Sequence, residues 1–86
     1  MNAFSLTIST PDGKLFDGSI TRLSLRGTEG ELAVMAGHIP FVTAVRPGEF
    51  HLDLPDGSIK RGQTEGGILT VTKDAVILLA GCAYWV

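Results

Sequence analysis

Apolar and polar residues alternate along most of this chain, and this alternation limits what the chain can fold into. Apolar side chains occupy every second position in residues 4–9, 22–26 and 49–54. Successive side chains of a β-strand point to opposite faces, so a period of two predicts strands with one face in a core and the other in water. No segment sustains the spacing of three and four that marks an amphipathic helix, and we expect no significant helix.

Turn signals separate these runs. Asp12-Gly13 and Asp56-Gly57 each lie between two alternating segments and are strong hairpin signals, and Lys73-Asp74 is a third candidate turn. Short strands at this spacing are typical of sandwiches and barrels. We therefore predict an all-β fold, a two-sheet antiparallel β-sandwich (flattened barrel) of about eight to ten short strands. We expect residues 1–86 to form a single domain, because the sequence shows no linker or repeat.

The apolar content is high for so small a domain. Hydrophobic residues make up 44% of the chain and charged residues 19%. A domain of this size buries only about 60–65% of the surface that its unfolded chain exposes, so some apolar side chains must lie outside. Residues 75–80 are apolar on both faces of their predicted strand, and only one face can meet the core. The other face needs a loop, the chain's own terminus or a partner protein to cover it.

Several classes of partner and location are disfavoured. The net charge is −2 and the basic residues are scattered apart from Lys60-Arg61, so no stripe exists to follow a nucleic-acid backbone. Cys82 is the only cysteine and cannot form an internal disulfide, which favours a reducing compartment. No apolar run approaches the ~20 residues that span a bilayer, and the first residues lack the pattern of a signal peptide. We expect no direct membrane insertion.

The candidates for chemistry are few. His38 could be a catalytic base, a metal ligand, an interface residue or an ordinary loop histidine, but a base or ligand needs companions. The other histidine, His51, lies on the polar face of a different strand, and Cys82 is far away in the sequence. Gly66-Gly67 is not followed by the residues of a phosphate loop, so a bulge or turn is expected there. We predict no catalytic residues, cofactor-binding residues or metal ligands, and no bound cofactor.

One local segment is distinctive. A short apolar strand is flanked by Gly30 and Gly37 and is followed by Pro40. Glycine permits positive φ and sharp turns, and proline favours an extended backbone in the residue before it. The segment therefore predicts a tight loop that holds Glu31 and His38 at its corners.

This loop resembles the signature loop of the epsilon subunit of the F-type (F1Fo) ATP synthase, in its N-terminal β-sandwich domain. Residues 10–18 resemble the opening hairpin of that family, residues 46–48 its next turn, and residues 66–80 its last two strands. The resemblance keeps its order over nearly the whole chain. It departs from the family pattern at Ala33, where glycine is common, and at Ala36, where proline is common.

The resemblance implies a non-catalytic subunit of the rotor, in the central stalk. Such a subunit links the gamma subunit to the c-ring, helps to couple ion translocation to ATP synthesis or hydrolysis, and meets the alpha and beta subunits only indirectly. It implies a peripheral position at the cytoplasmic face of the bacterial plasma membrane. By position in the family pattern, the c-ring contacts are Glu29, Gly30 and Glu31, and the gamma contacts are Thr10, His38 and Thr43.

The family usually continues into two C-terminal helices, which carry an inhibitory switch and, in some members, a nucleotide site. We expect this helical domain to be absent here, and with it ATP binding and inhibition by helix insertion. Either the subunit is naturally short or the chain is a segment of a longer one, and its aromatic ending, Tyr84-Trp85, favours the first. That ending is either an apolar tail folded over the last strand or a contact with a partner.

Two other functions remain open from the residues alone. A free-standing small β-sandwich that binds a peptide or ligand at an apolar face would show the same alternation. A small enzyme would need a constellation of nucleophile and base that the sequence does not offer. The ordered resemblance along the chain favours the rotor subunit over both.

Overall fold

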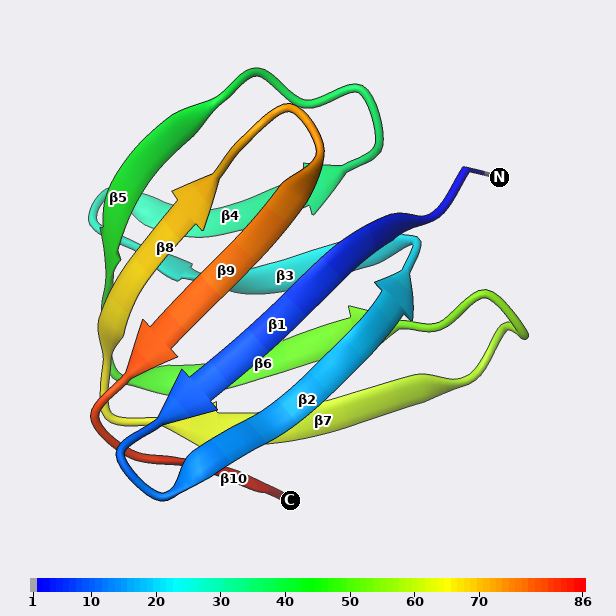
Figure 1. Cartoon of the computed structure of the whole chain (residues 1–86). Coiled ribbons are helices and arrows are strands. Elements are labelled where there is room, and N and C mark those ends of the chain that lie inside the picture. The colour runs from blue at the N-terminus through cyan, green and yellow to red at the C-terminus, as the bar shows by residue number, and fades with distance from the viewer. Residues whose placement is uncertain (1) are drawn as a thin grey trace.

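The computed structural model describes residues 2–86, which form ten strands in two five-stranded sheets packed face to face (Figure 1). Sheet I has the order β2-β1-β9-β8-β5, and sheet II has the order β10-β7-β6-β3-β4. The strands are β1 (Phe4–Thr10), β2 (Gly13–Ile20), β3 (Arg22–Gly27), β4 (Gly30–Met35), β5 (Phe41–Val45), β6 (Gly48–Asp53), β7 (Ile59–Thr64), β8 (Gly67–Val71), β9 (Ala75–Ala80) and β10 (Ala83–Trp85). The predicted all-β sandwich is confirmed. No segment within residues 2–86 is a helix suited to crossing a membrane.

All strand pairs but one are antiparallel. The exception joins β1 and β9, which run parallel with Ser5 opposite Ala75 and Ser9 opposite Leu79. Parallel neighbours cannot be joined by a tight turn and need a long crossover connection. Here that connection is the chain from β2 to β8, including most of sheet II. The sheet that carries β9 in its centre is therefore mixed.

The core lies between the two sheets and is built from alternate residues of nearly every strand. In β1, β3 and β6 the apolar positions that the alternation predicted are the ones that point inward. Burying an apolar side chain of this size stabilises the fold by about 1.5–3 kcal/mol. The buried hydrophobic residues are Phe4, Leu6, Ile8, Ile20, Leu23, Leu25, Val34, Val45, Phe50, Leu52, Leu69, Val71, Val76, Leu78 and Ala80.

The three predicted turns are confirmed. Gly13 and Gly57 have φ of 125° and 91°, a region that glycine enters without steric cost. In the turn between β6 and β7, Asp56 Oδ1 accepts hydrogen bonds from Ser58 Oγ at 2.6 Å and Ser58 N at 2.8 Å. These bonds favour the carboxylate and hold the pKa of Asp56 below its ordinary value. Lys73-Asp74 connects β8 to β9.

The C-terminal residues form a strand rather than a loose tail. β10 pairs with β7 at the edge of sheet II, so the chain crosses from β9 in one sheet to the other sheet. The Trp85 ring packs against Phe50 with centroids 5.8 Å apart and against Phe16 at 6.2 Å. Lys60 Nζ lies 4.5 Å from the centroid of the same ring. Of the two alternatives for this ending, a tail folded over the last strand is wrong, because β10 pairs with β7 in sheet II and β9 belongs to sheet I.

Gly62 makes room for the largest buried side chain. It lies opposite Phe50 in the β6–β7 pair, and Phe50 is fully buried. A Cβ built on Gly62 would lie 2.3 Å from Cζ of the Phe50 ring. Because Trp85 packs on the same ring, Phe50 has little freedom to move aside.

We expect Gly62→Ala to lower the free energy of unfolding by about 1–3 kcal/mol, the usual cost of overpacking a core. The matched control is Gly81→Ala, whose added Cβ meets no atom within 4 Å. That change should shift stability by no more than about 0.5 kcal/mol. Urea denaturation of both variants measures the difference. Equal midpoints would contradict the packing role given to Gly62.

Candidate interaction surface

The outer side of sheet I carries a continuous group of exposed apolar residues, which we call the apolar face. In the strand register, Ala44 lies beside Ile68, and Ile68 lies beside Leu79. Thr70 separates Val42 from Ile77 in the next row. Exposed fractions reach 66% for Val42 and 53% for Leu79. The apolar face consists of Val42, Ala44, Ile68, Ile77 and Leu79, on β5, β8 and β9.

This face exists because these three strands are apolar on both sides. Leu69 of β8 and Leu78 of β9 point into the core, and the residues next to them on each strand, Ile68, Ile77 and Leu79, point outward. The sequence predicted that the second face of residues 75–80 would need a loop, a terminus or a partner to cover it. Within residues 2–86 no loop or terminus does so, because β10 joins the other sheet. The face is therefore available to a partner.

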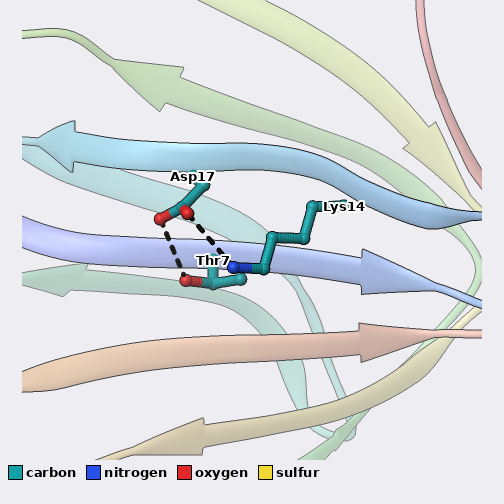
Figure 2. A network of polar contacts seen from close by, with 3 residues as sticks. All are labelled: Thr7, Lys14 and Asp17. Carbon is teal, nitrogen blue, oxygen red and sulfur yellow. Dashed lines mark hydrogen bonds and ion pairs between the residues drawn. The ribbon is translucent and has the colours of Figure 1, made fainter.

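A polar border runs beside the apolar face, on β1 and β2. Thr7 lies opposite Ile77 in the parallel pair, and its Oγ1 donates to Asp17 Oδ1 at 3.5 Å (Figure 2). Lys14 Nζ lies 3.3 Å from Asp17 Oδ2. An ion pair this exposed adds little to stability. An apolar centre with a polar margin is the usual composition of a protein interface.

A second surface feature is the acidic hairpin, which consists of Glu29 in the β3–β4 turn and Gly30 and Glu31 at the start of β4. Gly30 has a φ of 126°, which allows the tight turn, and all three residues are exposed. Glu31 lies opposite Arg26 in the β3–β4 pair. The hairpin and the start of β5, including Thr43, line an open depression of about 350 Å³. The structure thus brings the three expected c-ring residues together on one turn.

The three expected gamma residues are not gathered in one place. Thr10 ends β1, where its Oγ1 accepts from Asp12 N and donates to Gly13 O, both at 3.2 Å. Thr43 lies on the edge strand β5, opposite the buried Leu69.

His38 lies near Phe4 at the start of β1, whereas Thr10 lies at the end of that strand. Its Nε2 contacts the carbonyl oxygen of Thr72, in the turn that precedes β9, and its ring lies edge-on to Phe4. Thr10 and His38 therefore mark opposite ends of sheet I.

Reasoning from the sequence identified β9 but missed the rest of the apolar face. Val42 and Ile68 belong to it and were not singled out. The available signal was the same as for residues 75–80, since residues 41–45 and 67–71 also carry apolar residues on both faces.

Among residues 2–86, no three His, Cys, Asp or Glu side chains gather as a metal site would require. His51 Nε2 lies 2.8 Å from Glu49 Oε1, and both side chains are more than 40% exposed. This confirms the solvated polar face predicted for His51.

Comparison with known proteins gives a consistent family match. The profile of the family described as "ATP synthase, Delta/Epsilon chain, beta-sandwich domain" matches residues 3–86. The chain is 42% identical over 82 residues to the "ATP synthase epsilon chain, sodium ion specific" of Acetobacterium woodii, covering 95% of this chain and 62% of that one. It is 39% identical over 70 residues to the ATP synthase epsilon chain of Psychrobacter cryohalolentis, covering 81% and 51%. The chain thus spans about half to three-fifths of these relatives.

Solved structures share the fold. A chain of the Euglena gracilis mitochondrial ATP synthase (OSCP/F1/c-ring) matches with a TM-score of 0.91 and 24% identity, over 96% of this chain and 53% of that one. A chain of the Tetrahymena thermophila mitochondrial ATP synthase (central stalk/c-ring) matches with a TM-score of 0.77 and 18% identity, over 96% and 66%. At these identities the likeness establishes the sandwich fold.

Two neighbouring leucines test whether the apolar face is uncovered in the isolated chain. Leu78 is fully buried and Leu79 is 53% exposed, on the same strand. We expect Leu78→Ala to lower the free energy of unfolding by about 2–5 kcal/mol. Leu79→Ala should lower it by less than about 1 kcal/mol. Comparable losses in thermal or urea denaturation would mean that something covers the face.

Proposed function

Because this chain belongs to the family of ATP synthase delta/epsilon chains, we propose that it acts as a non-catalytic rotor subunit of an F-type ATP synthase. In this role it links the gamma subunit to the c-ring in the central stalk and helps to couple ion translocation to ATP synthesis or hydrolysis. The uncovered apolar face of sheet I is the observation that carries the proposal, since a sandwich with a complete core has no internal use for it. The names of the relatives support the same role.

The gamma subunit is the proposed occupant of the apolar face. Four large apolar side chains, Val42, Ile68, Ile77 and Leu79, would leave water on docking, and each Å² removed contributes about 25 cal/mol. The polar border of Thr7, Lys14 and Asp17 would set the register of the contact more than its strength. Thr10 and His38, at the two ends of sheet I, and Thr43, on its edge, are proposed to meet gamma at the margins.

The acidic hairpin is the proposed contact with the c-ring. Its two carboxylates are exposed, and they line an open depression that extends to Val42, at the edge of the apolar face. Charges in this position steer and orient docking onto a basic loop. The subunit would then carry two adjoining interfaces on one rigid body.

The physical role is mechanical. Two five-stranded sheets joined through a shared core resist shear, as a body that transmits torque between stalk and ring must do. Catalysis would remain with the alpha and beta subunits. The complex would hold this subunit at the cytoplasmic face of the bacterial plasma membrane, without insertion of the chain itself.

The proposal as a whole is tested by pulling down the tagged chain from detergent-solubilised membranes of its own cells. We expect gamma, alpha and beta to be recovered with it. A clean preparation that recovers none of them would favour the alternative, a free-standing sandwich that binds a peptide or ligand.

Leu79→Glu tests the gamma contact. A carboxylate in the apolar face would have to be desolvated on docking, so we expect affinity for purified gamma to fall at least about tenfold. The matched control is Ile59→Glu, an exposed apolar residue of β7 outside the face, which should bind as the original chain does. Isothermal titration calorimetry measures both. Equal affinities for all three chains would show that gamma does not use this face.

Glu31→Lys tests the ring contact. Glu31 is exposed, so the fold should remain intact while the reversed charge weakens attachment to the c-ring, most strongly at low salt. Glu65→Lys reverses another exposed carboxylate outside the hairpin and serves as the control. The measurement is the fraction of each variant retained on purified c-ring complexes across a salt series. Equal retention of both variants would remove the hairpin from the ring contact.

A further inference from the structure

His38 makes an unusual pair of contacts. Its Nδ1 lies 2.8 Å from the carbonyl oxygen of Met35, and its Nε2 lies 2.8 Å from the carbonyl oxygen of Thr72. A carbonyl oxygen can only accept a hydrogen bond, so each contact requires an N–H on the ring. A neutral imidazole carries one N–H, and the protonated ring carries two. Both hydrogen bonds therefore form only when the ring is protonated.

The two acceptors belong to different sheets. Met35 ends β4, the edge strand of sheet II, and Thr72 lies in the turn between β8 and β9 of sheet I. The Phe4 ring of β1 packs edge-on against the imidazole, with centroids 5.3 Å apart and an interplanar angle of 75°. Three segments distant in the sequence thus meet at one half-buried side chain.

Thr72 is held in its turn by three hydrogen bonds to Ala75. Thr72 N donates to the Ala75 carbonyl oxygen at 2.8 Å, and Thr72 Oγ1 bonds both to that oxygen and to Ala75 N at 3.0 Å. These bonds restrain the residue that supplies the acceptor oxygen to the ring. The free lone pair of an unprotonated ring nitrogen would face a carbonyl oxygen at hydrogen-bond distance, which is repulsive.

We propose that His38 is a proton-controlled strap that fastens the loop of residues 36–40 to the β8–β9 turn. The protonated ring donates to both carbonyl oxygens and closes the strap. Loss of the proton on Nε2 removes the hydrogen bond to Thr72, and Nδ1 keeps its hydrogen bond to Met35, three residues away in the same segment. The loop is then no longer fastened to the β8–β9 turn.

Charged side chains on the described elements around His38 are Lys73 and Asp74 on the β8–β9 turn and Arg22, which lies opposite Met35 in the β3–β4 pair. None of these three forms an ion pair with His38 within residues 2–86. The loop of residues 36–40 and the described residues before β1 carry no other titratable side chain. The contacts of the strap are therefore those to the two carbonyl oxygens.

The strap would restrain the segment that leads into β5, one of the strands of the apolar face. The loop contains Ile39, 81% exposed, and leads through Pro40 into β5, which carries Val42. A released loop would hold the start of β5 less firmly. An effect of pH on partner binding rests on the proposed function, whereas the strap itself is a property of the isolated chain.

Nuclear magnetic resonance on the ¹⁵N-labelled chain tests the strap without any partner. The ring nitrogens of both histidines are followed through a pH titration, and backbone order parameters are measured for residues 36–39 on either side of the His38 titration. We expect two N–H groups on His38 and order parameters near 0.8 in the protonated form, and values falling below about 0.6 after deprotonation. Order parameters that stay constant through the His38 titration would overturn the proposal.

Two matched variants separate the strap from general effects of pH. Glutamine has its two N–H donors on one nitrogen and does not titrate, so in His38→Gln the order parameters of residues 36–39 should no longer change with pH. In His51→Gln the change should persist, because His51 lies in sheet II and pairs with Glu49. A pH-dependent loop in His38→Gln, or its loss in His51→Gln, would also overturn the proposal.

Discussion

A strand has two faces, and a small two-layer sandwich has only one interior. Only one face of each strand can be buried in the core, and the arrangement of this structure depends on which residues occupy the other face. Most strands alternate and turn their polar side outward, but β5, β8 and β9 are apolar on both sides and meet at one part of sheet I. The core is complete without their outer residues. Their outer residues form the exposed apolar face, whose contact with water is unfavourable. This face lies beside the polar border on β1 and β2.

Much of the fold could be predicted because its signals are local. The alternation in residues 4–9 and the turns at Asp12-Gly13 and Asp56-Gly57 depend on neighbours in the sequence, and the structure has them as expected. The parallel pairing of β1 with β9 and the return of β10 to sheet II are set by contacts between distant segments. No pattern within a short window encodes such a choice, because either pairing would bury the same inward residues.

The candidate surfaces also divide into one that is local in the sequence and could be predicted, and one that depends on distant segments and could not. Glu29, Gly30 and Glu31 are consecutive, so one hairpin necessarily presents them together. Thr10, His38 and Thr43 come from three different elements, and the sequence alone does not reveal that they lie at two ends and an edge of the sheet. The contacts of His38 with two carbonyl oxygens could not be predicted from the sequence either. Met35 and Thr72 contribute backbone atoms, and the residue type does not indicate where those atoms lie.

The parallel pair also has a consequence for how the protein is made. Ser5 must find Ala75, so sheet I cannot close until most of the chain has left the ribosome. Until then the β1–β2 hairpin shows an unpaired edge on β1 and an uncovered apolar side. Contacts this distant in sequence slow folding, and exposed edges invite pairing with other chains. During synthesis, the nascent hairpin is therefore exposed to pairing with other chains until β9 reaches it.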